Sequence, residues 1–157
     1  MKNARIRPAT PDDLDAMLAI LPRLAEFKLP PNRKAVDLWQ GDADTLRTWA
    51  ADGSDALRVL VADHEGTGVV GVALVRLQPE FMSGAPSAHL EAIAVATVAD
   101  GHGVGRRLLE AAEDEATRGG ALSMTLHVFA NNERARSVYD RSGYDGELLR
   151  YVKPLTD

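Results

Sequence analysis

The sequence predicts an α/β fold built around one mixed β-sheet. Segments with the alternating or β-branched apolar residues of strands are interleaved with segments whose apolar residues recur every three to four positions, as on one helix face. The expected order of elements along the chain is β-α-α-β-β-β-α-β-α-β. Strands that follow one another directly pair antiparallel, and a late helical crossover adds one parallel pair. A length of 157 residues is typical of one domain, so we expect a single domain over residues 1–157.

The N-terminal third is expected to hold one strand and two helices. Residues 5–7 predict a short first strand. Pro11 suits the first position of a helix, and leucine or methionine then recurs at helical spacing over residues 14–24. Pro22 can kink this helix or end it early. Residues 27–41 predict a long irregular loop, and residues 44–51 predict a second helix. Long ordered loops are often functional, so this loop is a candidate binding segment.

The rest of the chain is expected to complete the sheet. Residues 57–62 and 69–77 predict two strands of a β-hairpin, because a glycine-containing turn separates them. The elements expected after the hairpin are a strand, a helix, a strand, a helix and a last strand, over residues 89–95, 104–118, 122–129, 133–141 and 148–152.

Composition excludes several classes of function. The chain has no cysteine, so it has no disulfide, no zinc-thiolate site and no thiol nucleophile. Its 18 lysine and arginine residues against 23 aspartate and glutamate residues give a net charge of −5, which is unsuited to general nucleic-acid binding. No run of about 18 apolar residues predicts a membrane span, and the N-terminus lacks the apolar stretch of a secretory signal. We therefore expect a cytoplasmic protein with no metal, no nucleic acid and no membrane partner.

A glycine-rich turn between a strand and a helix is the most informative segment. The apolar strand ends at Val95, and Asp100–Gly105 follows before the next helix. Backbone N–H groups of such a turn and helix start can hold a pyrophosphate. A Walker A loop is excluded because Arg106 follows Gly105, and a dinucleotide fingerprint is excluded because its third glycine is missing. From this segment alone, an ordinary glycine-rich turn stays an alternative.

This turn resembles the Arg/Gln-x-x-Gly-x-Gly/Ala loop of the GNAT superfamily of N-acetyltransferases. A second block, Leu126–Tyr144, is similar to the family's strand-Asn-x-x-Ala-x-x-x-Tyr-x-x-x-Gly-aromatic pattern. Both blocks stand in the family's order, and the N-terminal half matches only in its pattern of elements. The resemblance implies a three-layer α/β/α fold whose mixed, mostly antiparallel central sheet is splayed between the fourth and fifth strands.

The same resemblance implies an enzyme that uses acetyl-CoA as co-substrate and moves its acetyl group directly to a primary amine. The acceptor is a small-molecule or peptide amine whose identity stays open, and so does a homodimer. The alternative from another class is a non-catalytic acyl-CoA-binding or regulatory domain. Such a domain would keep the glycine turn and Asn132 but would not need Tyr139.

The resemblance also assigns residues to the co-substrate. The backbone before the turn pairs with the pantetheine arm, and the turn holds the pyrophosphate. The family usually has arginine or glutamine where this chain has Asp100, and proline where it has Thr97. Restoring the family's residue by Asp100→Arg is expected to tighten CoA binding. The implied cofactor-binding residues are Ile93, Ala94, Val95, Gly101, His102, Gly103, Val104, Gly105, Arg106 and Asn132.

Two residues are implied to be catalytic. Tyr139 matches the family's tyrosine, a general acid toward the departing thiolate, and its alternative role is core packing. Glu91 matches a glutamate that some members use as general base, and its alternative role is a solvated or ion-paired carboxylate. Strand alternation predicts Glu91, Ile93 and Val95 on one face. Other candidate bases are His89, His102 and His127, and candidate acceptor-site residues are Glu26, Phe27, Asp37 and Trp39.

Overall fold

The computed structural model describes residue 1 and residues 3–156. The chain divides into two compact units, Met1–His127 and Val128–Asp157, and each is described by itself. The first unit holds the sheet and the second holds one helix. The single domain expected from length stays a prediction.

The first unit is built on a five-stranded sheet in the order β1-β2-β3-β4-β5. Neighbouring strands are antiparallel from β1 to β4, and β4 and β5 are parallel. A mixed, mostly antiparallel sheet is thereby confirmed. The strands are β1 (Arg5–Pro8), β2 (Leu57–His64), β3 (Gly68–Pro79), β4 (Pro86–Val95) and β5 (Met124–Leu126).

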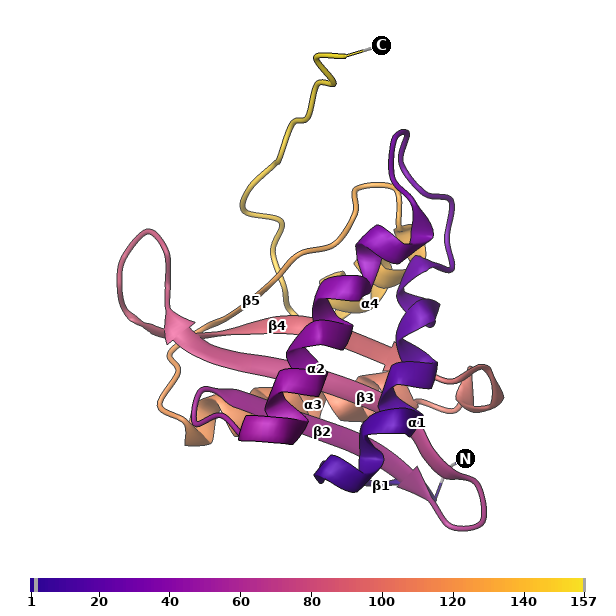
Figure 1. Cartoon of the computed structure of the whole chain (residues 1–157). Coiled ribbons are helices and arrows are strands. Elements are labelled where there is room, and N and C mark those ends of the chain that lie inside the picture. Colours follow the sequence, from indigo (N-terminus) through magenta and orange to yellow (C-terminus); the bar gives the residue numbers. More distant parts are fainter. Residues whose placement is uncertain (2, 157) are drawn as a thin grey trace. The chain divides into compact units, whose positions relative to one another are not determined.

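Helices cover both faces of this sheet. Helices α1 and α2 lie on one face and α3 lies on the other, which gives the expected three layers (Figure 1). Short 3-10 helices η1 to η4 occupy several connections. The helical elements of the first unit are η1 (Pro11–Asp13), α1 (Leu14–Ile20), η2 (Leu21–Ala25), η3 (Ala35–Leu38), α2 (Gln40–Asp52), η4 (Thr97–Ala99) and α3 (Val104–Arg118), and the second unit holds α4 (Glu133–Arg141).

The sheet is splayed between β4 and β5, as the resemblance implied. The parallel pairing runs only from Ala88 to Leu90 on β4, although β4 continues to Val95. Among the described residues, the backbone from Glu91 to Val95 therefore has β3 as its only strand partner. The open side of β4 is a strand edge whose amide groups can pair with an extended ligand.

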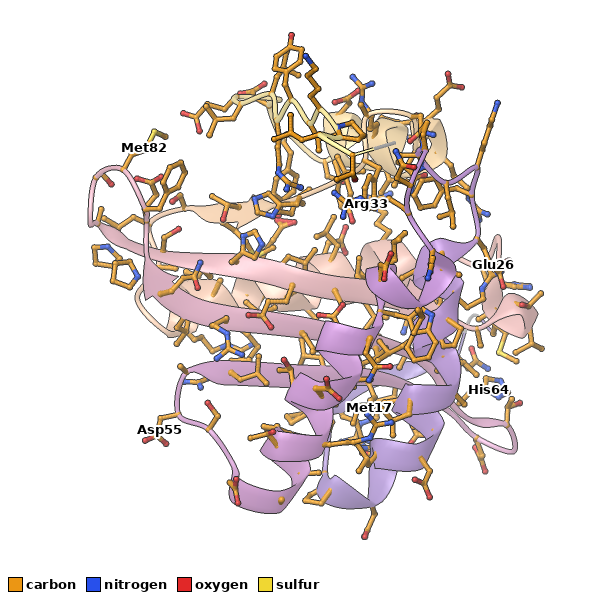
Figure 2. The ribbon with its side chains drawn as sticks, turned by 45° about the horizontal axis from the view of Figure 1, so that its top comes forward. Met17, Glu26, Arg33, Asp55, His64 and Met82 are labelled. Atoms are coloured by element: carbon orange, nitrogen blue, oxygen red, sulfur yellow. The ribbon has the colours of Figure 1, made fainter. Side chains whose placement is uncertain are left out.

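Each face of the sheet has its own apolar core. On the α1 and α2 face, Met17 is fully buried against β2, β3 and β4 residues (Figure 2). On the α3 face, the buried side chains recur at helical spacing, and burial of each large one contributes about 1.5–3 kcal/mol. These α3 residues are Val104, Leu108, Leu109, Ala112 and Ala116.

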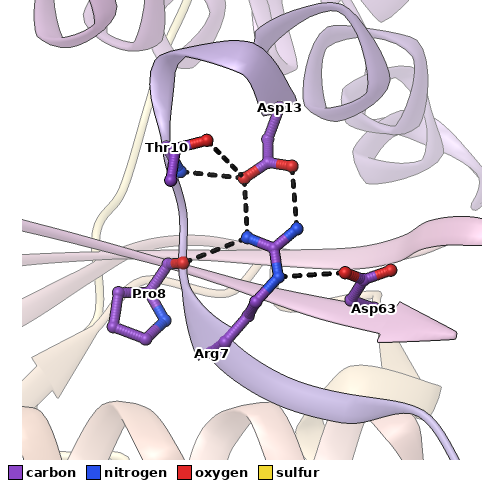
Figure 3. A network of polar contacts seen from close by, with 5 residues as sticks. All are labelled: Arg7, Pro8, Thr10, Asp13 and Asp63. Carbon is purple, nitrogen blue, oxygen red and sulfur yellow. Dashed lines mark hydrogen bonds and ion pairs between the residues drawn. The ribbon is translucent and has the colours of Figure 1, made fainter.

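An arginine ties the first strand to the start of α1. The Arg7 guanidinium donates two hydrogen bonds to Asp13, at 2.8 and 2.9 Å, and a third from Nε to Asp63 on β2, at 2.9 Å (Figure 3). This interaction holds the pKa of Asp13 below its ordinary value. The network fixes where the chain leaves β1 and enters the helical layer.

One helix ends early, as Pro22 indicated, and two strands differ from the sequence-based expectation. The apolar pattern over residues 14–24 is α-helical only to Ile20, because Pro22 lacks an N–H and disfavours helix before it. The strand expected over residues 122–129 is limited to β5. The strand expected over residues 148–152 is wrong: these residues form no regular structure, and their apolar side chains are exposed. A strand needs a paired neighbour, and residues 128–156 contain none.

Candidate functional site

The backbone between β4 and α3 has the conformation expected of an anion-binding turn. Gly101 and Gly103 both have φ of 74°, a region that other residues rarely adopt. Gly103 is the residue before the first turn of α3, a helix of 15 residues. A Cβ atom added at either glycine would meet no atom within 4 Å, so the space before this turn is open.

Packing does not explain the third glycine of the turn. A Cβ atom at Gly105 would lie 3.5 Å from Cγ2 of Val95, an ordinary van der Waals distance. The fold therefore tolerates a larger residue at this position. A glycine here leaves the backbone of the first turn of α3 accessible, where N–H groups lack helical partners and the helix dipole favours anions.

Asp100, the departure from the family pattern, lies in an ion pair. Arg23 Nη2 donates a hydrogen bond to Asp100 Oδ2 at 2.6 Å, and Arg23 Nε donates one to the carbonyl oxygen of Val95 at 2.9 Å. Arg23 lies in η2 and also pairs with Glu26. The acidic residue of the turn is thus neutralised by a cation from a distant part of the chain. No local sequence pattern indicates that Arg23 is this cation, because it lies 77 residues from Asp100.

A β-bulge changes where Glu91 points. Leu74 pairs with Ala92 and Val75 pairs with Leu90, so Glu91 is an extra residue on β4. Its carboxylate forms an ion pair with Arg76 on β3. Arg76 also lines a groove beside α2, so Glu91 points to the α2 side of the sheet.

The shared face expected for Glu91, Ile93 and Val95 is therefore wrong. Val95 faces α3, because its Cγ2 lies against the Cβ position of Gly105. Ala92 and Ala94 belong to the α1 and α2 core, so Ile93 points away from that core by alternation. The sequence could not reveal the bulge, because it depends on the register between β3 and β4.

Asp42 is a functional candidate that the sequence analysis missed. It lies in the first turn of α2 and is partly buried. Among the described residues it has no hydrogen bond or ion pair, and the group acting on it is Glu91. Burial and then the negative charge of Glu91 raise the pKa of Asp42 to about 7. A carboxyl group with this pKa can accept a proton near neutral pH.

An open groove of about 380 Å³ lies on the same side of the sheet as Glu91. It runs along the second half of α2 to the start of β2. Trp49 and two threonines give it apolar and hydrogen-bonding surface, and Arg76 links it to Glu91. The lining residues are Asp44, Thr45, Thr48, Trp49, Gly53, Ser54, Leu57 and Arg76.

The histidines have different surroundings. His89 Nδ1 lies 2.7 Å from Thr125 Oγ1, and its ring contacts His127 edge to face, with centroids 4.7 Å apart. Burial, and then the charge of His127, lower the pKa of His89. The contact between His89 and Thr125 joins β4 to β5 where the parallel pairing occurs. His102 is exposed in the glycine turn.

The expected acceptor-site residues of the long loop have local structural roles. Trp39 packs against the α1 and α2 core, and Asp37 accepts a hydrogen bond from Lys34 N at 2.9 Å. Glu26 is paired with Arg23, as noted above. A role for Phe27 or these residues at an acceptor stays a prediction.

The second unit contains the other two motif residues. Asn132 caps α4, since its Oδ1 accepts a hydrogen bond from Ala135 N at 3.3 Å. The Tyr139 ring contacts the Tyr144 ring edge to face, with centroids 5.9 Å apart, and burial raises the pKa of Tyr139 above its ordinary value of 10. The roles of Asn132 and Tyr139 at the co-substrate stay predictions.

No three histidine, aspartate or glutamate side chains of the described residues gather in an arrangement that could hold a metal ion. Within the same residues, no helix combines the length and apolar character needed to cross a membrane.

Comparisons with known proteins agree with the motif and the fold. The model of the acetyltransferase (GNAT) family matches residues 21–144. The uncharacterized N-acetyltransferase YhfO of Bacillus subtilis is 31% identical over 142 residues, which cover 89% of each chain. The mycothiol acetyltransferase of Propionibacterium freudenreichii is 30% identical over 133 residues, and these cover 85% of this chain and 40% of that protein.

Solved structures extend the comparison to the whole fold. The structure of AAC(6')-Iy in complex with the bisubstrate analog CoA-S-monomethyl-acetylneamine superposes with a TM-score of 0.70 at 20% identity, covering 97% of this chain and 99% of that one. A structure described as a transcriptional regulator from Bacillus halodurans C-125 gives a TM-score of 0.73 at 21% identity, with 98% and 100% coverage. At these identities the likeness concerns the fold.

Proposed function

This chain belongs to the acetyltransferase (GNAT) family and is an N-acetyltransferase, and from that premise we propose that it transfers the acetyl group of acetyl-CoA to a primary amine. The observation that carries the proposal is the open edge of β4 leading into the glycine turn and α3. A CoA-containing analog in one structural neighbour also supports acetyl-CoA as co-substrate.

The residues of this segment fit the co-substrate. Backbone groups of Ile93 to Val95 would pair with the pantetheine arm, and the Gly101–Gly105 turn would bind the pyrophosphate. The open space at the Cβ positions of Gly101 and Gly103 supports this role, because a side chain at either position would block a ligand from reaching the backbone of the turn. The co-substrate itself supplies a thioester, whose carbonyl carbon is open to attack by an amine.

Carboxylates on the α2 side of β4 support an amine acceptor. A primary amine with a pKa near 10 is mostly an ammonium ion at neutral pH, so it must lose a proton before it attacks. Glu91 would attract the ammonium group, but its carboxylate is held by Arg76. Asp42 has no such partner and carries a raised pKa of about 7. We therefore assign the general-base role to Asp42 and an electrostatic role to Glu91.

Tyr139 is the proposed proton donor to the departing thiolate. Its raised pKa keeps the hydroxyl group protonated at neutral pH, as a donor requires. In this scheme Asp42 takes one proton from the ammonium group, the amine nitrogen forms a bond to the acetyl carbon, and the carbon–sulfur bond breaks. The thiolate takes the tyrosine proton, and the second proton, released by the acylated nitrogen, goes to solvent, from which the tyrosine is protonated again.

The test is an acetyl-transfer assay with purified protein, acetyl-CoA and a panel of primary amines that includes polyamines, amino acids, aminoglycosides and short peptides. Amine-dependent release of the CoA thiol, with the acetylated product identified by mass spectrometry, is the expected result. CoA binding without transfer to any amine would instead favour the non-catalytic acyl-CoA-binding domain. The cytoplasmic location and the homodimer stay predictions.

A further inference from the structure

One arginine contacts both ends of the segment that joins β4 to the glycine turn. Arg23 is 72 residues from Val95 and 77 residues from Asp100 in the chain. Its Nε bonds the carbonyl of Val95, the last residue of β4, and its Nη2 bonds the carboxylate of Asp100, the first residue of the turn. The guanidinium therefore fixes where this segment begins and where it ends.

The fold holds Arg23 in place. The α-helix stops at Ile20 and the chain continues as η2, in which Leu21 is fully buried in the α1 and α2 core. Element η2 also packs against β4. The Arg23 side chain is only 20% exposed, so its two contacts are shielded from much of the solvent screening that weakens surface ion pairs.

We propose that Arg23 is a positioning residue that, through Asp100 and the Val95 carbonyl, holds the Gly101–Gly105 turn in the conformation that binds the pyrophosphate of CoA. The inference rests on the proposed function, and it adds a residue from outside both family motifs. A turn that is already ordered loses less conformational entropy when a ligand binds, so its affinity is higher. The pairing also cancels the negative charge of Asp100, which would repel phosphate groups.

This arrangement reverses one expectation from the sequence. Restoring the family's arginine by Asp100→Arg was expected to tighten CoA binding. In the structure, that substitution would place a second guanidinium beside Arg23 and remove the bond that orders the turn. We therefore expect Asp100→Arg to weaken CoA binding.

The decisive experiment compares two acetyl donors. Acetyl-CoA carries the pyrophosphate, and S-acetylpantetheine does not. For Arg23→Gln we expect the Kd of CoA, measured by calorimetry, and the KM of acetyl-CoA to rise roughly five-fold, given the modest energies of single ion pairs. The KM of S-acetylpantetheine and the kcat with either donor should stay at the wild-type values.

A double-mutant cycle tests the pair itself. Arg23→Gln should weaken CoA binding more than Asp100→Asn, because it also loses the bond to the Val95 carbonyl and leaves the charge of Asp100 unpaired. The double variant should bind CoA no more weakly than Arg23→Gln alone, because the ion pair can be lost only once. Arg23→Lys should keep only part of the wild-type affinity for CoA, since an ammonium group cannot reproduce the planar guanidinium's bonds to both the Val95 carbonyl and Asp100. Arg118→Gln is the matched control, because it breaks the ion pair with Glu115 at the far end of α3.

Unaltered CoA affinity in folded Arg23→Gln, or an equal loss with both acetyl donors, would overturn the positioning role. If Arg23→Gln does not fold, the cycle is run with Arg23→Lys and Asp100→Asn, and additive losses of affinity would then overturn it. A wild-type protein that binds no CoA would contradict the proposed function, whereas the other outcomes concern Arg23 alone.

Discussion

Replacing Glu91 with glutamine distinguishes the role of Glu91 from that of Asp42, the two carboxylates proposed to act on the acceptor amine. The substitution removes a negative charge that acts on Asp42 and keeps the size of the side chain. The pKa of Asp42 should then fall from about 7, because the like charge is gone, but it should stay above its ordinary value, because burial is the larger cause. A general base acts as the carboxylate, so a lower pKa extends activity to lower pH.

The size of the effect follows from the pKa. With a base of pKa about 7, about a tenth of the enzyme is in the active form at pH 6, so kcat/KM there is roughly a tenth of its plateau. Since burial dominates, we expect Glu91→Gln to move this acidic limb down by at most about one pH unit, equivalent to about 1.4 kcal/mol. Asp42→Asn should remove the limb and lower kcat/KM near pH 7 by about 10² or more.

The assay is kcat/KM for the acceptor amine, followed by thiol release from about pH 5 to pH 9. Asp52→Asn is the matched control, since Asp52 lies on the same helix but is exposed and outside the groove. Its pH profile should match that of the wild type. If Glu91→Gln loses the acidic limb while Asp42→Asn keeps it, Glu91 is the base and the assignment of Asp42 is refuted.

Three further predictions concern the turn, the acid and the fold. Gly103→Asp or Gly105→Asp should abolish CoA binding in calorimetry, because each adds bulk and negative charge at the turn; undiminished affinity in a folded variant would exclude this site. Tyr139→Phe should lower kcat by at least about ten-fold with CoA affinity little changed, and full kcat would make Tyr139 a packing residue. Asp13→Asn should lower the free energy of unfolding by about 1–3 kcal/mol at neutral pH, since it breaks the charged hydrogen bonds from Arg7. Because the folded pKa of Asp13 is depressed, its contribution exists above the unfolded pKa of about 3.9 and is lost as pH falls through the folded value, so denaturant unfolding of the two proteins should converge in acid.

Local patterns predicted most of the fold and the glycine turn. The hairpin of β2 and β3, and the helix α3, follow from short-range apolar spacing and from glycines at their ends. The turn could be predicted because Gly101 and Gly103 adopt positive φ values, a local backbone conformation that favours glycine. Such features need no knowledge of distant residues.

Features that depend on distant residues were missed. The contact from Arg23 to Asp100 spans 77 residues, and no pattern near either residue indicates it. The raised pKa of Asp42 arises from its burial and from the charge of Glu91, which stands far from it in the sequence. The strand expected over residues 148–152 was wrong for the same reason, because a strand depends on a partner as well as on its own composition.

The bulge at Glu91 determines what the deletion of this one residue of β4 would do to the strand. Because Glu91 is the extra residue, deleting it would leave Leu90 opposite Val75 and Ala92 opposite Leu74, so the ladder would become regular and both halves of the strand would keep their faces. In an evolving lineage, such a deletion would remove the carboxylate directed at α2, the ion-pair partner of Arg76, without moving any other side chain of β4 to the opposite face. When homologous sequences are compared, a one-residue gap here should therefore be treated as a change of chemistry rather than as loop variation.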